Sequence, residues 1–178
     1  QRTIGSLEAR IGHTFMDNQR DFTEIRLHGM ADRIDNENGT VVVTDYKTGS
    51  VEARELKLKG NWTEKLDEGK SGKALQLLMY AAIALETLGP DGRQRTDTTA
   101  QIDRVRAGIR SGKNAHAGLI PLSIDGQTFI EQHHANELLH WISQKLQALH
   151  QTNTGLEHET ESKYCAYCTV LDPLPEYF

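Results

Sequence analysis

Three charged residues, Asp32, Asp45 and Lys47, stand where two predicted strands end. A polar Asn-Gly cluster separates two apolar or alternating segments, at about 22–35 and 40–47, and this arrangement is typical of a β-hairpin. Asp45 and Lys47 are two positions apart, so they share one face of the second strand. Asp32 lies near the end of the first strand. The hairpin therefore predicts two carboxylates and one ammonium at a single spot.

The chemistry that suits this set is metal-assisted hydrolysis of a phosphodiester. Carboxylate oxygens hold Mg²⁺ or Mn²⁺, and the cation polarises phosphate and lowers the pKa of an attacking water. A lysine beside the ligands can position that water or offset developing negative charge. The alternative is a solvated charge pair, a common use of Asp-x-Lys at a strand end. The hydrophobic run 41–43 favours the chemical interpretation, because a buried strand that ends abruptly in charges needs a reason.

Three short motifs, in this order, resemble the RecB-type nuclease branch of the PD-(D/E)XK superfamily. They are Gly29-x-x-Asp32-Arg33-Ile34-Asp35, Asp45-Tyr46-Lys47-Thr48-Gly49 and Gln76-x-x-x-Tyr80, with a weaker echo at Tyr164-Cys165-Ala166-Tyr167-Cys168. The resemblance implies an α/β fold: a mixed β-sheet with flanking helices and a restriction-endonuclease-like core. It implies a metal site formed by Asp32, Asp45 and the carbonyl of Tyr46. Lys47 would orient or activate water.

Gln76 and Tyr80 are four positions apart on a helix predicted over 73–88, so they share a face. Gly89-Pro90 is expected to end that helix. The resemblance makes both residues candidate catalytic residues that support the substrate. The glutamine can bind a phosphate, a metal-bound water or Lys47, and the tyrosine can contact the DNA backbone. The alternative is a core aromatic with a hydrated hydroxyl and a surface amide.

The remaining segments are expected to complete one nuclease domain over residues 1–178. The first is a strand over 10–17, unless a short helix extends through 7–10, and the second is a charged loop over 51–70 with room for a short helix. Strands over 100–110 and 119–124 can form a hairpin, and a helix follows over 127–150.

Several side chains in these segments carry their own interpretations. Trp62 is interpreted as a surface anchor, with packing over the rim of the site as the alternative. Arg104 and Arg106 share one side of their strand and can follow a phosphate backbone, although a solvated face is the default. The histidines of the last helix are interpreted as surface residues, because no ligand falls at a spacing that completes a zinc site. These histidines are His133, His134 and His140.

Composition limits the partners. A net charge of −5 over 178 residues is not that of a free-standing nucleic-acid binder, whose affinity comes from neutralising phosphates. Basic residues gather in 91–113, however, so a local basic surface is expected. The longest apolar run, near 81–85, is far too short to span a membrane, and the first residues show no signal-peptide pattern. We therefore expect a cytoplasmic protein with no membrane partner.

The tail over 155–178 contains Cys165 and Cys168, the two cysteines of the chain. Two thiolates do not close a tetrahedral metal site. In some relatives of the resembled branch four cysteines hold an iron–sulfur cluster, and Leu174 stands where the last of them would be. We expect this chain to hold no such cluster unless a parent protein supplies the missing ligands.

The sequence as a whole predicts a metal-dependent DNA nuclease, an exonuclease of recombinational repair, that uses Mg²⁺ or Mn²⁺. The expected partners are DNA and a helicase domain or subunit of a parent protein. The chain opens at Gln1 without Met, so we expect an excised fragment. The resembled family places a further metal-site residue, usually His, on an upstream helix. His13 is the sole candidate here and its segment has strand character, so the fragment alone is expected to cut poorly.

Two other functions remain open from the sequence. One is a catalytically inactive nuclease fold that binds DNA or acts as a scaffolding lobe of a helicase complex. The presence of Asp32, Asp45 and Lys47 argues against it, because decay usually removes at least one of them. The weaker alternative is another nucleotide or phosphate hydrolase with the same metal cage.

Overall fold

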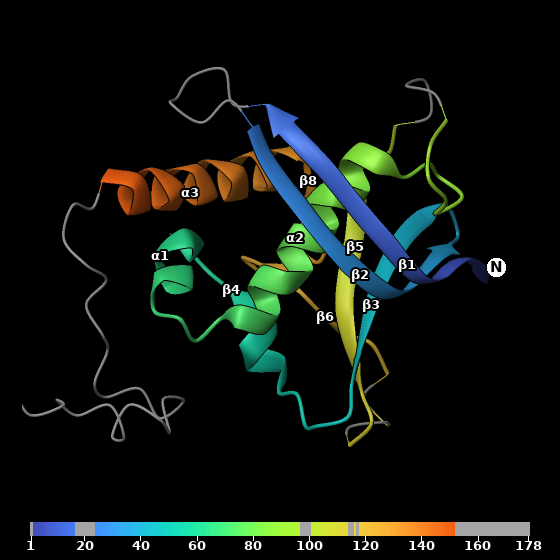
Figure 1. The fold of residues 1–178 in the computed structure, drawn as a ribbon. Helices are drawn as coiled ribbons and strands as arrows, with labels where there is room; N and C mark the ends of the chain where they lie inside the picture. The colour runs from blue at the N-terminus through green and yellow to red at the C-terminus, as the bar shows by residue number, and fades with distance from the viewer. Residues whose placement is uncertain (1, 17–23, 97–100, 114–115, 117, 152–178) are drawn as a thin grey trace, which may run out of the picture.

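The structure is a computed structural model that describes residues 2–16, 24–96, 101–113, 116 and 118–151. In this part of the chain six strands form the main sheet, in the order β1-β2-β3-β5-β6, with β8 also paired to β5 (Figure 1). Within this sheet only β3 and β5 pair in parallel, and the other pairs are antiparallel. The strands are β1 (Arg2–Met16), β2 (Glu24–Glu37), β3 (Thr40–Lys47), β5 (Arg104–Ser111), β6 (Ile120–Pro121) and β8 (Ile130–Glu131).

The predicted hairpin is β2 and β3. Asn38 and Gly39 have φ values of 51° and 84°, and two successive positive φ values are what an Asn-Gly hairpin turn requires. The side-chain oxygen of Asn36 accepts a hydrogen bond from the N–H of Gly39 at 3.0 Å. β3 is buried continuously from Val41 to Asp45, because it lies between β2 and β5 and its β-branched residues pack on both faces. The hairpin prediction is confirmed.

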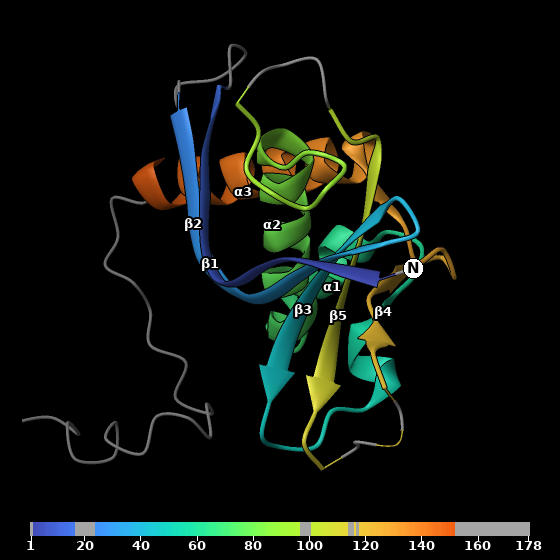
Figure 2. The same ribbon diagram turned by 90° about the vertical axis from the view of Figure 1, so that its right-hand side faces the viewer.

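Helix α2 (Gly72–Thr87) crosses one face of the sheet and contacts β1, β2, β3 and β5. Figure 2 shows it behind β3 and β5. Its Ala- and Leu-rich sequence favours a helix and supplies much of the core. Its fully buried side chains are Ala74, Leu77, Leu78, Ala81, Ala82, Ile83, Ala84 and Leu85. The helix that the sequence predicts at 73–88 is therefore confirmed, and its face toward β3 can present side chains to the end of that strand.

A smaller layer completes the core. It consists of a 3₁₀ helix η1 (Ala53–Leu56), α1 (Trp62–Asp67), α3 (Gln132–Gln151), and the short parallel pair β4 (Lys57–Leu58) and β7 (Ser123–Ile124). The mixed sheet with flanking helices confirms the predicted α/β class. No helix in the described part of the chain is long and apolar enough to cross a membrane.

Several local predictions were wrong in their bounds. β1 begins at Arg2 and pairs with β2 along its whole length, so the helical alternative at 7–10 is wrong. The loop predicted at 51–70, with room for a short helix, contains that helix as α1, and it also contains η1 and β4, which were not predicted. α3 begins at Gln132 rather than at residue 127, because Ile130 pairs with Val105 of β5 and extends the preceding backbone. Long-range pairing overrides local propensity in β1 and just before α3.

Two buried side chains were interpreted wrongly. Trp62 is only 2% exposed, and its Nε1 donates to Glu137 of α3 at 3.1 Å, so it joins α1 to α3 rather than anchoring a surface. His134 is buried, and its Nδ1 accepts the N–H of Glu131 at 3.1 Å. Both are core residues whose polar atoms have protein partners.

Candidate active site

The end of the hairpin places Asp32 beside β3. The ladder between β2 and β3 ends at the pair Arg33 and Thr44, and from Asp32 back to Glu24 β2 pairs with β1 alone. At this divergence Oδ2 of Asp32 accepts a hydrogen bond from the N–H of Tyr46 at 2.7 Å. Asp32 is therefore held against the backbone that separates Asp45 from Lys47, as the hairpin predicts.

Asp45, Lys47 and Gln76 form one contact network. Asp45 is 4% exposed, and its Oδ1 accepts from Nε2 of Gln76 at 3.1 Å. Nζ of Lys47 lies 2.9 Å from Oδ2 of Asp45 and donates to Oε1 of Gln76 at 3.2 Å. The amide of Gln76 thus holds the carboxylate with one end and the ammonium with the other.

Tyr80 extends the network into the core. Nε2 of Gln76 donates to the Tyr80 hydroxyl at 2.8 Å, and that hydroxyl donates to the carbonyl of Met30 at 2.9 Å. Tyr80 is 6% exposed. Because its ring is buried and its hydroxyl is bonded on both sides, Tyr80 is placed to orient Gln76 and not to reach a ligand, which disfavours the predicted contact with a DNA backbone.

Gly29 makes room for this tyrosine. A Cβ built on Gly29 would lie 2.4 Å from Cε1 of Tyr80, and real Cβ atoms do not approach other atoms so closely. The sequence placed Gly29 in a motif but assigned it no role. The structure assigns it one: the absent side chain lets the Tyr80 ring lie against β2.

The model of one protein family matches most of the chain. It is that of the PD-(D/E)XK nuclease superfamily, and it matches residues 2–172. The chain belongs to this superfamily. No curated protein and no solved structure matches it. Members are metal-dependent phosphodiesterases that typically use a divalent metal and act on nucleic acids. The mixed sheet with flanking helices in this chain agrees with their restriction-endonuclease-like core. Asp45-Tyr46-Lys47 has the (D/E)XK form in the superfamily's name, whereas Asp32 follows Ala31 where that name has Pro before Asp.

The donor set fits the divalent cation that the superfamily implies. Oδ2 of Asp45 is buried and forms no hydrogen bond with any described residue, and its contact with Nζ of Lys47 at 2.9 Å is an ion pair. A buried carboxylate oxygen with this spare capacity is suited to a hard cation such as Mg²⁺ or Mn²⁺. Among the described residues no group of three or more His, Cys, Asp or Glu side chains can hold a metal. The carbonyl of Tyr46 and water would have to complete the ligand shell.

His13 is not placed to complete that shell. It lies on β1, paired with Leu27, and its ring packs edge-on against Phe15 with centroids 4.7 Å apart. Leu27 precedes Asp32 by five residues, about 17 Å along a strand. The segment is a strand, as predicted.

The two arginines predicted to follow a phosphate backbone lie at the wrong end of β5. Val105 pairs with Val41, whereas Ser111 pairs with Lys47, so β5 starts far from the candidate site. Arg106 forms an ion pair with Glu37 at 3.7 Å, and Arg104 stacks over Phe129 at 4.3 Å. The parallel register instead brings Arg110 beside Tyr46. Sequence reasoning missed Arg110, because nothing local reveals which end of a strand meets a site.

The cysteine pair cannot be placed. Cys165 and Cys168, with the rest of the tail over 155–178, lie outside the described residues. The expectation that they bind no iron–sulfur cluster stays a prediction.

Proposed function

We propose that this chain is a metal-dependent deoxyribonuclease of the RecB-type branch, acting as an exonuclease in recombinational repair beside a helicase domain or subunit. The observation that supports it best is the network in which Gln76 binds both Asp45 and Lys47. A charge pair that is only solvated needs no third side chain that hydrogen-bonds to both of its members. An amide that fixes a buried carboxylate and an ammonium together indicates a site whose geometry matters.

In this proposal Asp32, Asp45 and the Tyr46 carbonyl would hold Mg²⁺ or Mn²⁺. Such a cation, when bound, neutralises charge on the phosphate and lowers the pKa of the attacking water. Lys47 has its ammonium next to the ligand carboxylate, where it can orient that water and offset negative charge that develops on the phosphate. Gln76 keeps the ammonium in place, and Tyr80 keeps Gln76 in place.

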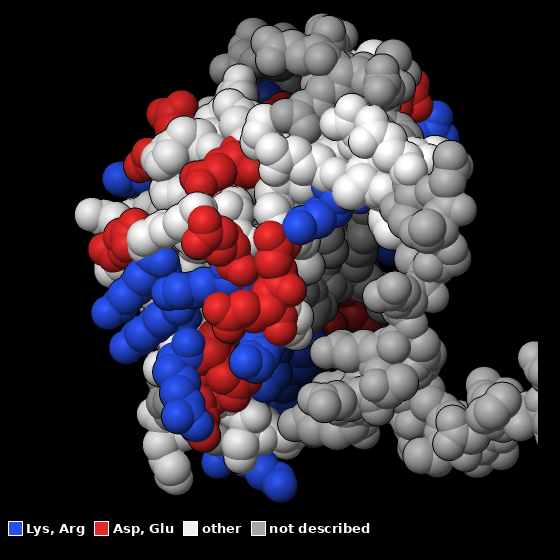
Figure 3. Space-filling view, turned by 90° about the vertical axis from the view of Figure 1, so that its left-hand side faces the viewer, with Lys and Arg blue, Asp and Glu red and all other residues white. Residues whose placement is uncertain are grey.

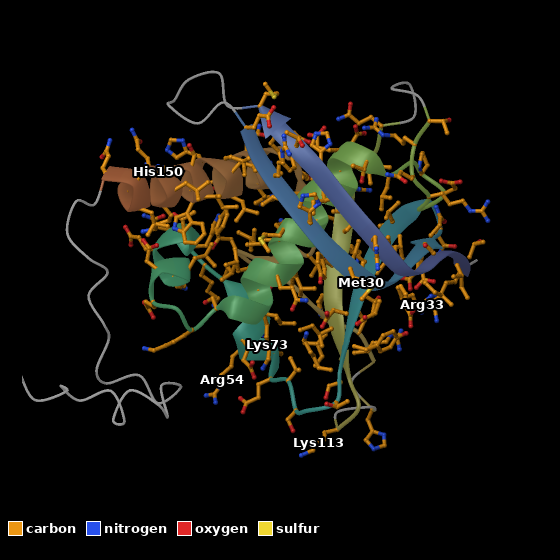
Figure 4. The ribbon with its side chains drawn as sticks, viewed as in Figure 1. Met30, Arg33, Arg54, Lys73, Lys113 and His150 are labelled. Carbon is orange, nitrogen blue, oxygen red and sulfur yellow. The ribbon has the colours of Figure 1, made fainter. Side chains whose placement is uncertain are left out.

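The surface offers cations to a nucleic acid despite the net charge of −5. On the face shown in Figure 3, Lys and Arg atoms gather at the lower left beside a cluster of Asp and Glu atoms. Figure 4 shows Lys73, Arg54 and Lys113 along the lower part of the molecule, the part toward which β3 and β5 run in Figure 2. Lys73 pairs with Glu55, and Arg54 pairs with Glu52. Because ion pairs at the surface are weak, a nucleic-acid phosphate could compete with these carboxylates for both cations.

The decisive experiment compares linear and circular DNA in Mg²⁺, in Mn²⁺ and in EDTA. We expect metal-dependent cutting of linear DNA from its ends, with circular DNA spared. Lys47→Ala should lower turnover by about 10²-fold or more while calorimetry still detects Mn²⁺ binding. Lys57→Ala, which removes an exposed lysine of β4, is the matched control and should cut normally.

Three outcomes would count against the proposal. Normal cutting by Lys47→Ala would show that this lysine is only a surface charge. DNA binding without any cutting, in Mg²⁺ or Mn²⁺, would favour the inactive scaffolding lobe. Cutting of circular DNA as fast as linear DNA would exclude an exonuclease.

A further inference from the structure

A cavity of about 400 Å³ adjoins the candidate site. Its walls include Tyr46, Lys47, Arg110 and the backbone at Gly112 and Gly118. A volume of this size is in the range of sites that bind small organic groups. Because Lys47 lines both this cavity and the network around Asp45, anything bound in the cavity lies directly beside the candidate catalytic lysine.

The sheet geometry sets an aromatic ring and a guanidinium side by side in this cavity. Tyr46 lies between Asp45 and Lys47 in sequence, so its side chain projects from the opposite face of β3. In the parallel ladder Tyr46 pairs with Arg110, and paired residues on adjacent strands project to the same side. The Tyr46 side chain is 47% exposed, which is unusual for a large aromatic ring on a central strand.

Arg110 differs from the other arginines of this face. Arg33 donates to Asp35 at 2.8 Å, and Arg106 pairs with Glu37 at 3.7 Å. Arg110 is half-buried, yet no residue in the described part of the chain forms an ion pair or hydrogen bond with its guanidinium group. A guanidinium that is partly withdrawn from water and has no protein partner is suited to an anionic ligand.

We propose that Tyr46 and Arg110 form a subsite for one nucleotide of a single-stranded nucleic acid, with the base stacked on the Tyr46 ring and its phosphate paired with Arg110. The inference rests on the proposed function and deepens it. Exposed aromatic rings next to cations bind single strands because every base offers a face for stacking. Bases in a duplex are already stacked on their neighbours, so the subsite selects unpaired nucleotides.

The position of the subsite defines a path for the strand. The Tyr46 ring and the Asp45 carboxylate lie on opposite faces of β3, and Lys47 is the residue that touches both regions. A strand held at Tyr46 must therefore pass over the end of β3 at Lys47 to bring its next phosphate to the two carboxylates. The subsite thus positions the nucleotide beside the one that is cut.

The test measures binding in EDTA, so that it does not depend on cutting. The probe is a short single-stranded oligonucleotide with 2-aminopurine, a base whose fluorescence falls when it stacks, at successive positions. With the 178-residue chain we expect quenching at one position. Tyr46→Phe should keep the quenching, because the ring remains. Tyr46→Leu should lose it and weaken binding about tenfold, the scale of one stacked base.

Arg110 is tested with a control on the same strand. Arg110→Gln should weaken binding of the single strand about tenfold and leave binding of a blunt duplex nearly unchanged. Arg104→Gln removes the same charge at the opposite end of β5 and should affect neither. Thermal unfolding of each variant separates loss of binding from loss of the fold.

The proposal is overturned if the parent chain quenches no position, if Tyr46→Leu quenches like the parent, or if Tyr46→Phe behaves like Tyr46→Leu. It is also overturned if Arg110→Gln binds no more weakly than Arg104→Gln. These outcomes are separate from failure of the nuclease proposal. A chain that shows the quenching pattern and cuts nothing in Mg²⁺ has the subsite without the activity.

Discussion

Asp35 and Asp45 are buried carboxylates on neighbouring strands, and the protein neutralises their charges in different ways. Asp35 is fully buried on one face of the sheet and accepts from Arg2 at 2.5 Å and from Arg33 at 2.8 Å. Asp45 lies on the other face and has one ammonium and one amide, with an oxygen that forms no hydrogen bond in the described part of the chain. One carboxylate is saturated by its neighbours, and the other keeps capacity for a cation.

The pKa of Asp35 reflects this saturation. Burial is the largest single influence and raises the pKa, but the hydrogen bonds and the positive charges of Arg33 and Arg2 together outweigh it, and the net pKa is lowered. A carboxylate of this kind contributes to stability while it is ionised. The comparison indicates that Asp35 serves the fold and Asp45 serves the chemistry.

The largest effect is expected at Asp45. Asp45→Asn removes a candidate ligand charge, so turnover should fall by about 10³-fold or more, since metal stabilisation of the transition state is worth several kcal/mol. Calorimetric titration should show that Mn²⁺ binding is lost, as it should be in Asp32→Ala. Asp35→Asn, the matched substitution, should bind Mn²⁺ like the parent. Equal Mn²⁺ binding by all three variants would refute the metal assignment.

Asp35→Asn should instead destabilise the fold. It leaves Arg2 and Arg33 without their carboxylate, and because both arginines are partly exposed we expect a loss of about 1–3 kcal/mol in the free energy of unfolding. Urea unfolding measures it. Since the folded pKa is lowered below the ordinary value of 3.8, the difference between parent and variant should be constant at neutral pH and shrink as the pH falls through that lowered pKa. A difference that persists in strong acid would mean that packing, not charge, is responsible.

Gly29→Ala tests whether turnover depends on the hydrogen bonds by which Tyr80 holds Gln76, and Gln76 holds Asp45. The new methyl group would collide with the Tyr80 ring, which we expect to cost about 1–3 kcal/mol of stability and, by shifting Gln76, to lower turnover about tenfold or more. Gly72→Ala at the start of α2 is the control, since its Cβ would meet nothing within 4 Å and alanine favours a helix. If Gly29→Ala cuts as fast as Gly72→Ala, the position of Tyr80 does not govern the site.

The smallest effect is expected far from both carboxylates, at His134. Burial is the main cause that lowers its pKa below 6.5, and His133 beside it lowers the pKa further. The neutral ring accepts the N–H of Glu131, and protonation removes that acceptor. The stability it contributes should therefore be present above pH 6.5 and be lost as the pH falls through the lowered pKa. Urea unfolding between pH 8 and pH 5 should show a steeper decline for the parent than for His134→Asn, and parallel declines would contradict this.

The hairpin with its Asn-Gly turn and the amphipathic helix with Gln76 and Tyr80 could be predicted from the sequence. Each depends on a local period or a turn residue, and such signals act over a few positions. The same signals predicted Asp32, Asp45 and Lys47 at one spot, because a hairpin fixes its own register. The family motif supplied the link from the hairpin to the helix.

Only the tertiary structure decided which other side chains join that spot. The parallel pairing of β3 with β5 put Arg110, and not Arg104 or Arg106, beside the site, and no local pattern encodes the register of two strands separated by more than fifty residues. The close approach of α2 to β2 gave Gly29 its role against Tyr80. The packing of α1 against α3 likewise allows Nε1 of Trp62 to donate a hydrogen bond to Glu137. Contacts between distant segments depend on how whole elements pack, and packing selects them by shape and by the need to satisfy every buried polar group.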